Sequence, residues 1–257
     1  MAARTTRTIM DMASRMTIEA PQTFAKGKTL AEALAADGAV STALFAWFSP
    51  AFPTGGFAYS HGLEAAAAEG LIGDERGLAA WLEGVLMAGG GWNDAVLLNA
   101  AHSLATGGDE ATMAELSDLA LALAPSRERL AETVGQGQAF RAAVAAGWPQ
   151  AICPGLPERV AYPIAAGTAC ALIGAAAQTA LTAYLTGFCA NLIAAGVRLS
   201  LTGQTGGVRI LSGLNPVIVE IAGRAAASTL DDLGGCAMGA DVAAMRHETL
   251  HTRLFIS

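Results

Sequence analysis

The chain has 257 residues, of which 53% are apolar, 6% aromatic and 14% charged, and its net charge is −7. That length suffices for one large domain or two small ones, and we favour one domain. The excess of acidic residues argues against a nucleic-acid partner, because a protein that binds nucleic acid usually presents a basic surface to it. Alanine supplies much of the apolar content and is the best helix former, so the composition predicts an all-α, single-domain orthogonal bundle of about eight to ten helices.

The N-terminal residues differ from the rest of the chain. Residues 1–40 carry scattered basic side chains but no continuous apolar core of the kind that a secretory signal requires. We expect a polar, partly disordered extension at 1–40, an all-helical domain at 41–245 and a cytoplasmic location. The cysteines are far apart and lack C-x-x-C spacing, which predicts reduced thiols rather than a zinc knuckle or a disulfide framework. They are Cys153, Cys170, Cys189 and Cys236.

Helical periodicity is readable along much of the chain. After Asp74, which can cap a helix, apolar residues recur at three- and four-residue steps as far as Gly89. A loop rich in proline is expected at 147–159, and Asn215-Pro216 is expected to open a helix that reaches about Ala227. No sustained period-2 alternation supports a sheet. Further helices are predicted at 92–104 and at 109–123. A longer helix is predicted to have Pro125 in its first turn and to reach about residue 146.

No charged residue occurs between Arg159 and Arg198. A stretch of that length could span a bilayer twice, and its small residues would suit close packing in a membrane. The segment is rich in Ala, Gly and Thr, however, contains Gln178 and Asn191, and lacks flanking basic clusters. We therefore expect two buried central helices and no membrane partner.

The sequence HETLH at 247–251 matches H-E-x-x-H, in which two histidines bind zinc beside a glutamate base. A zinc protease also needs a third ligand, typically further along the chain, and none of the residues after His251 has a carboxylate or imidazole side chain. A metal-dependent hydrolase using His247, Glu248 and His251 is the alternative. We favour an amphipathic terminal helix, on one face of which His247 and His251 would hold nickel or copper only weakly.

Two further stretches resemble catalytic motifs. AYSHG at 58–62 is similar to a hydrolase nucleophile elbow with Ser60 as nucleophile, but the preceding SPAFPTGGF is a Pro/Gly turn rather than the strand that an elbow requires. LTGQTGGVRIL at 201–211 lacks the lysine of a P-loop, and we expect a helix break in which Gln204 caps or bridges neighbouring helices. We predict no catalytic residue and no permanently bound cofactor.

Three stretches together resemble one family, the urease accessory protein UreF. SPAFPTGGFAYSHGLEAA (49–66) resembles its opening motif S-x-x-P-x-G-G-F-x-x-S-x-G-L-E, and LTGQTGG (201–207) is similar to its central G-Q segment. RHETLHTRLFIS (246–257) resembles its tail R-H-E-x-x-x-x-R-L-F-x-S, so the resemblance spans about residues 41–257. The matching positions of the first two stretches are Pro53, Gly55, Gly56, Phe57, Ser60, Gly62, Leu63, Glu64, Gly203 and Gln204.

The resemblance implies an all-α homodimer without enzymatic activity. It would bridge the GTPase UreG and UreD, also called UreH, and regulate GTP-dependent insertion of nickel into apo-urease, with nickel at most in transit. Residues 246–257 would form a docking tail that becomes ordered against UreD. Where the family often has a basic residue, Ile256 leaves one charge contact absent or replaced by an apolar one. The matching tail positions are Arg246, His247, Glu248, Arg253, Leu254, Phe255 and Ser257.

Overall fold

The computed structural model describes residues 23–24, 28–105, 107 and 110–257. The chain divides into two compact units, residues 1–41 and 42–257. In the first unit, strand β1 (Thr23–Phe24) pairs antiparallel with β2 (Lys28–Thr29), and helix α2 (Leu30–Trp47) begins. Most of the extension predicted at 1–40 lies outside the described residues, and its described part is helical from Leu30.

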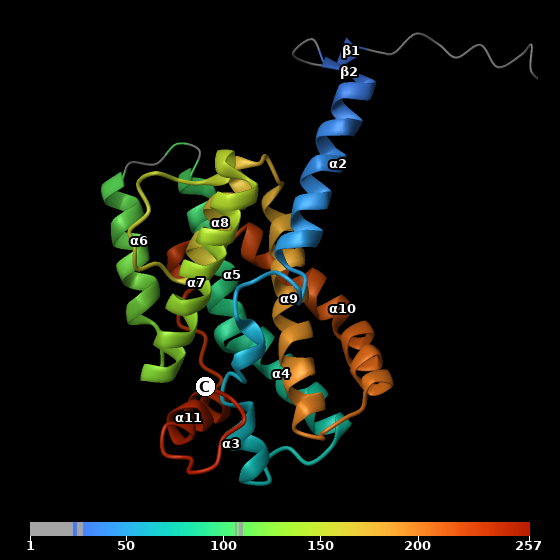
Figure 1. Cartoon of the computed structure of the whole chain (residues 1–257), viewed down its shortest axis with the longest axis vertical. Helices are drawn as coiled ribbons and strands as arrows, with labels where there is room; N and C mark the ends of the chain where they lie inside the picture. Colours follow the sequence, from blue (N-terminus) through green and yellow to red (C-terminus); the bar gives the residue numbers. More distant parts are fainter. Residues whose placement is uncertain (1–22, 25–27, 106, 108–109) are drawn as a thin grey trace, which may run out of the picture. The chain divides into compact units, whose positions relative to one another are not determined.

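The second unit is built from helices joined by loops and short 3₁₀ helices, so the all-α prediction is confirmed (Figure 1). Short 3₁₀ helices occupy Gly56–Ala58, Pro149–Ala151 and Leu230–Asp232. The α-helices after α2 are α3 (Leu63–Ala68), α4 (Glu75–Ala88), α5 (Gly90–Ala105), α6 (Glu110–Ala122), α7 (Arg127–Gly147), α8 (Tyr162–Leu172), α9 (Ala177–Arg198), α10 (Gln204–Ala226) and α11 (Met238–His247).

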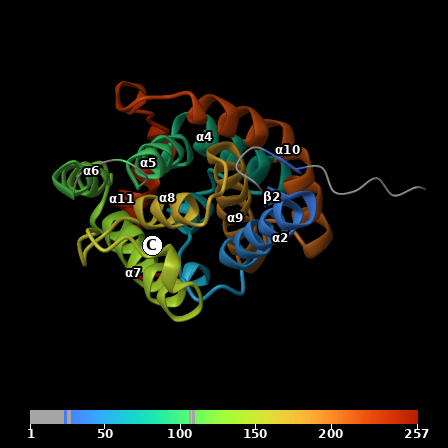
Figure 2. The same cartoon turned by 90° about the horizontal axis from the view of Figure 1, so that it is seen from above.

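Helices α5, α8 and α9 form the centre of this unit (Figure 2). Every residue from Pro163 to Ala171 of α8 is buried, as expected for the charge-free segment. Small residues allow this packing, because a Cβ at Gly167 would collide with the carbonyl oxygen of Leu98 on α5. In the described part of the chain, α9 alone is long and apolar enough to cross a membrane, and half of its apolar window is buried within the fold, as in an ordinary core helix.

Capping residues explain where several helices begin. The Asp74 carboxylate accepts a hydrogen bond from the Gly77 N–H at 2.8 Å, as predicted for the start of α4. At α7 the cap is Ser126, whose hydroxyl accepts from the Arg129 N–H at 3.1 Å. Pro125 therefore precedes the cap. The prediction that Pro125 lies in the first turn of this helix is wrong.

Helix α10 corrects a second boundary. The predicted helix from Asn215 is the later half of a helix that begins at Gln204, with Pro216 inside it. Pro216 and Ser212 are both exposed, and on an exposed side of the helix water can replace the hydrogen bond that proline takes from the Ser212 carbonyl. The helix break predicted nearby does occur, but Gly203 rather than Gln204 is the N-cap of α10.

Candidate functional site

The first and last family-like motifs lie side by side. The Ile256 N–H donates to the carbonyl oxygen of Ala58 at 2.8 Å, and the Ser60 N–H donates to the carbonyl oxygen of Ser257 at 2.8 Å. The Ser60 hydroxyl donates to the same oxygen of Ser257. We call the arrangement the tail clasp: residues 58–64 with Glu128 and Glu132 of α7, which together hold residues 253–257. The C-terminal segment can be followed beside α3 and α11 in Figure 1.

A turn with two left-handed residues shapes the clasp. His61 has φ of 58° and Gly62 has φ of 79°, so α3 begins directly after a sharp change of direction, as expected for a helix start after a glycine turn. A Cβ on Gly62 would lie 2.7 Å from the backbone nitrogen of Ala244 on α11, so only glycine allows these two helices to approach so closely. The turn directs Ser60, His61 and Glu64 into the interior, where all three are buried.

Glu64 holds the main chain of the tail. One carboxylate oxygen accepts from the Leu254 N–H at 2.6 Å, and the other accepts from the Phe255 N–H at 3.0 Å. The second oxygen also lies 3.0 Å from Nε2 of His247. A carboxylate that accepts several hydrogen bonds inside a protein fixes its donors firmly, because each bond is charge-assisted.

Glu128 lies at the other ring nitrogen of His247 from Glu64, and it binds the side chain of Arg253 in the tail. Its Oε2 lies 2.6 Å from Nδ1 of His247, and its Oε1 accepts from Nη1 of Arg253 at 2.6 Å. The imidazole of His247 has 0% of its side-chain surface exposed. His247 thus lies between two carboxylates, and each of these carboxylates also binds the tail.

Glu132 holds the end of the tail. It accepts from the Ser257 hydroxyl at 2.5 Å, forms an ion pair with Arg129, and lies 3.6 Å from Nδ1 of His61. Burial opposes ionisation of Glu132, but Arg129 and His61 outweigh it and hold the pKa of this carboxyl well below its usual range. Burial, and then the charge of Arg129, lower the pKa of His61. Near neutral pH this cluster therefore contains a charged Arg129–Glu132 pair and a neutral His61.

Arg198, at the end of α9, joins the two motifs on their outer side. Its guanidinium donates to the carbonyl oxygens of Phe57 and Leu254 and lies 4.1 Å from the ring centroid of Phe255. Phe255 is buried beneath it, whereas Phe57, Leu254 and Ile256 are 73%, 61% and 59% exposed. The two motifs therefore present a shared apolar surface to solvent.

The loop that carries the first motif also covers a cavity of about 170 Å³. Residues 49–57 line it together with aromatic side chains, and Asn191 fixes the loop by donating to the carbonyl oxygen of Gly56 at 2.9 Å. Pro53, Gly55 and Gly56 are part of this lining. A second cavity of about 80 Å³, lined by His61, shares Asp94, Arg129 and Thr133 with the first. The clasp therefore borders a polar interior.

Asp94 is a second carboxyl in this interior whose pKa is strongly shifted, in the opposite direction to that of Glu132. It keeps some accessible surface where it lines both cavities, and it accepts a hydrogen bond from the Tyr184 hydroxyl at 2.7 Å. Burial raises the pKa of Asp94 to about 6, although Arg129 and Tyr184 act in the opposite direction. Near neutral pH this carboxyl is therefore close to its titration range.

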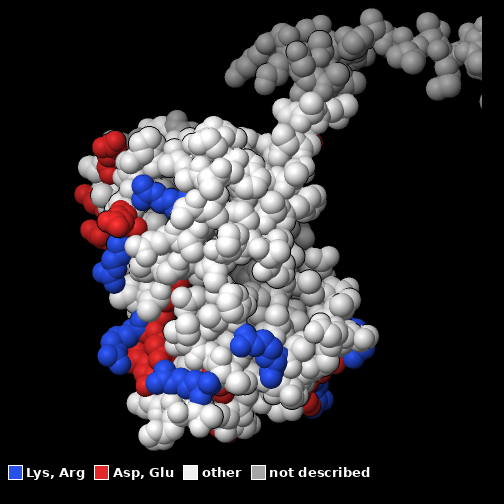
Figure 3. Space-filling model, in the orientation of Figure 1, with Lys and Arg blue, Asp and Glu red and all other residues white. Residues whose placement is uncertain are grey.

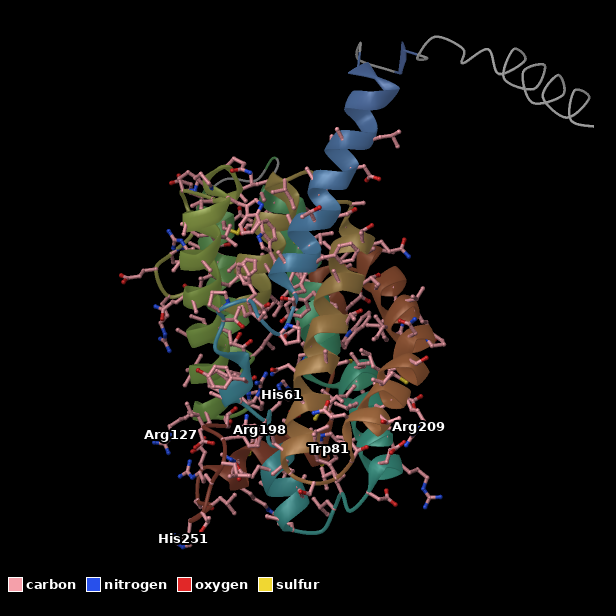
Figure 4. The ribbon with its side chains drawn as sticks, turned by 45° about the vertical axis from the view of Figure 1, so that its right-hand side comes forward. His61, Trp81, Arg127, Arg198, Arg209 and His251 are labelled. Atoms are coloured by element: carbon pink, nitrogen blue, oxygen red, sulfur yellow. The ribbon has the colours of Figure 1, made fainter. Side chains whose placement is uncertain are left out.

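The structure overturns the metal-dependent hydrolase. Helix α11 ends at His247, so His247 and His251 do not share a helical face, and the terminal amphipathic helix expected beyond His247 is absent from the described structure of residues 248–257. Both ring nitrogens of His247 face carboxylates, and His251 lies exposed at the edge of the molecule while His61 lies inside it (Figure 4). Glu248 is bound by Arg127. Within the described residues, no three His, Cys, Asp or Glu side chains are placed to hold a metal ion.

The structure agrees with the sequence-based rejection of a nucleophile elbow at 58–62. Ser60 follows a 3₁₀ turn rather than a strand, and its hydroxyl is engaged by Ser257. The central G-Q segment lies apart from the clasp: Gly203 and Gln204 begin α10, and the Gly206 that follows packs against Glu75 of α4. Cys153, Cys170, Cys189 and Cys236 are free thiols, as predicted.

The tail residues singled out by sequence divide into two groups. His247, Phe255 and Ser257 are buried within their own chain, and the tail, expected to become ordered against a partner, is held by the clasp in this structure. Arg246, Glu248, Arg253 and Leu254 reach solvent to different extents, and Arg246 pairs with Glu69. Sequence reasoning missed Glu128, Glu132 and Arg198. The i, i+4 spacing of the two glutamates is their only local signal.

Comparisons with known proteins agree with the resemblance. The UreF family model matches residues 72–215 of this chain. A "Urease accessory protein UreF" from Mesorhizobium japonicum is 49% identical over 214 residues, which cover 83% of this chain and 95% of that protein. Proteins of the same name from Rhizobium leguminosarum bv. viciae and Brucella ovis are also 49% identical over 214 residues, covering 95% and 92% of their lengths. These names describe accessory proteins, which confirms the prediction that the chain is not an enzyme.

Proposed function

Because the chain belongs to the UreF family of urease accessory proteins, we propose that it is an adaptor that bridges the GTPase UreG and UreD (UreH). In this role it regulates GTP-dependent insertion of nickel into apo-urease, and nickel passes in transit without a permanently bound cofactor. We further propose a cytoplasmic homodimer. Charged side chains gather at the left edge and lower part of the face in Figure 3 and leave much of that face uncharged, which supports contact with other proteins.

The tail clasp is the observation that carries the adaptor proposal. Residues 254–257 alternate between exposed and buried, the period of an extended strand whose inner side chains are fixed by the fold. Phe255 and Ser257 point inward, and Leu254 and Ile256 point outward. We propose that Leu254 and Ile256, with Phe57, form the surface that docks on UreD, with Arg246, Glu248 and Arg253 at its rim. His247, Phe255 and Ser257 contribute by holding the tail in place. In this surface Ile256 supplies an apolar contact.

Docking can be separated from folding by changing only the outward side chains. The variant Leu254→Asp combined with Ile256→Asp should lose co-purification with UreD while its thermal unfolding midpoint stays close to that of the unchanged chain. The matched control is Val208→Asp on α10, where an exposed valine lies outside the clasp and the outward tail positions. If a chain lacking residues 246–257 assembled with UreD as well as the full chain, the tail would not be the docking element.

The remaining parts of the proposal have their own measurements. Light scattering of the purified chain should give the mass of a dimer. A pull-down from a urease-producing cell should recover UreD and UreG together. If a chain with an intact clasp recovered neither UreD nor UreG, the proposed adaptor role would be contradicted.

A further inference from the structure

We propose that α10 contains a hinge at residues 213–216, about which its first half, residues 204–212, opens while its second half, residues 217–226, stays packed. The opening is a property of the isolated chain and goes beyond the adaptor role, so it would stand even if the adaptor proposal failed. The first half lies in the stretch 201–211 that was weighed as a nucleotide loop. Helix α10 packs against α9, α4 and α5, and its course beside α9 and α4 can be followed in Figure 1.

The two halves of α10 are anchored unequally. In the first half the buried residues are Gly206, Gly207 and Ile210, so only one large apolar side chain is buried there. The second half buries two isoleucines and two alanines. Because stabilisation grows with the apolar area that is buried, the first half is held less firmly than the second. The buried residues of the second half are Ile218, Ile221, Ala222 and Ala225.

The polar contacts of the first half add little to this anchoring. Arg209 pairs with Glu75 of α4 at 2.9 Å, but 63% and 38% of the two side chains are exposed. Glu75 also accepts a hydrogen bond at 3.1 Å from the Thr202 hydroxyl, just before the helix begins. Solvent screens an exposed ion pair, so its contribution is small. In the second half, by contrast, the guanidinium of Arg224 lies 4.8 Å from the ring centroid of Trp92 on α5.

The residues between the two halves weaken the helix. Pro216 has no N–H group, so the carbonyl of Ser212 lacks its helical hydrogen bond. Gly213 is less favourable in a helix than alanine, and no atom of the described residues lies within 4 Å of a Cβ placed on it. Both Gly213 and Pro216 are exposed. Packing within the chain therefore does not account for the weak point, although Leu214 between them is buried.

Opening at this place breaks the helix where it is weakest and gives up the smaller of its two apolar anchors. Local unfolding follows such boundaries, because its free energy depends on the contacts of the segment that opens and not on those of the whole domain. The open form would uncover Ile210 and would separate Arg209 from Glu75. The contacts of the second half with α5 and α9 would remain.

Hydrogen exchange of the full-length chain, followed residue by residue by NMR, tests the hinge. After division by the intrinsic exchange rate of each amide, the amides of residues 208–212 should exchange at least about tenfold faster than those of residues 217–225. Equal protection of the two sets would overturn the proposal.

Two matched pairs of variants place the opening at the hinge. Gly213→Ala should slow exchange at residues 208–212 by about fivefold, because alanine favours the helical state. Gly223→Ala makes the same change in the second half, where a Cβ meets only an ordinary contact distance, and should leave these amides unchanged. Ile210→Val should speed their exchange by about fivefold, whereas Ile218→Val should not affect it. If the two members of either pair had the same effect on residues 208–212, α10 would not open at this hinge.

Discussion

Ser60 and Ser257 are 197 positions apart in the chain, yet the backbone and the hydroxyl of Ser60 both donate to the carbonyl oxygen of Ser257. Both residues are buried, with 0% and 2% of their surface exposed. The two family-like motifs are therefore two parts of one structure. A substitution in either motif should therefore alter how firmly the other motif is held.

The first prediction concerns the Ser60 hydroxyl. Ser60→Ala removes one of the two hydrogen bonds to Ser257 and keeps the backbone bond, so it should lower the free energy of unfolding by about 1 kcal/mol. Trypsin cleavage after Arg253 should become faster, because the tail is held less firmly. Urea denaturation and the cleavage rate provide the two measurements. Thr182→Ala, which removes a hydroxyl bond within α9, is the control and should leave tail cleavage unchanged.

The second prediction separates backbone strain from collision. Gly62 and Gly70 have nearly the same φ, 79° and 74°, but a Cβ meets the backbone of Ala244 only at Gly62. Gly70→Ala should therefore lower the free energy of unfolding by about 1 kcal/mol, from the left-handed conformation alone. Gly62→Ala should lower it by at least about 3 kcal/mol, since α3 and α11 must also move apart.

The thermal unfolding midpoints of the two variants measure this difference. Equal effects would mean that the close approach of α3 and α11 contributes nothing beyond the conformation of the turn.

The third prediction concerns the buried pair of Arg129 and Glu132. Glu132→Gln leaves Arg129 charged and without its anionic partner in the interior, which should cost about 3 to 5 kcal/mol. The exposed pair of Glu75 and Arg209 is the matched comparison, and Glu75→Gln should have a much smaller effect because solvent screens both charges. Chemical denaturation of the two variants gives the comparison. A similar loss in both would show that burial adds little to the Arg129–Glu132 pair.

The fold could be predicted from sequence because its signals are local. Alanine content and the three- and four-residue spacing of apolar side chains fix helices, and Asp74 marks a start through its own hydrogen bond. The misplaced boundaries are those that the spacing of apolar residues does not specify. Pro216 is accommodated by an exposed helix face, and α11 stops at His247, after which the chain is held by the clasp.

The site was less readable because its contacts join distant parts of the chain. The tail motif was recognised, but its acceptor Glu128 resembles any solvent-exposed glutamate in the first turn of a helix. Burial of Glu132 depends on how α7 packs, which periodicity does not specify. Arg198 ends the long charge-free stretch, and this was the one signal that could have drawn attention to it.

The fourth prediction uses Asp94, whose pKa is raised to about 6 from 3.8. Between these values the folded chain binds more protons than the unfolded chain, so the contribution of this residue to stability falls as the pH rises. The total change is about 2 to 3 kcal/mol. Asp94→Asn is neutral at every pH and should lack this decline, while its amide oxygen can still accept from Tyr184.

Urea denaturation at several values between about pH 4 and about pH 7 gives the difference in stability between Asp94→Asn and the unchanged chain. That difference should shift in favour of the variant with rising pH, and a constant difference would show that Asp94 titrates normally. Tyr184→Phe tests the cause. The Tyr184 hydroxyl favours the ionised carboxylate, so its removal should shift the decline of the unchanged chain to higher pH, whereas a shift to lower pH would contradict the assigned hydrogen bond.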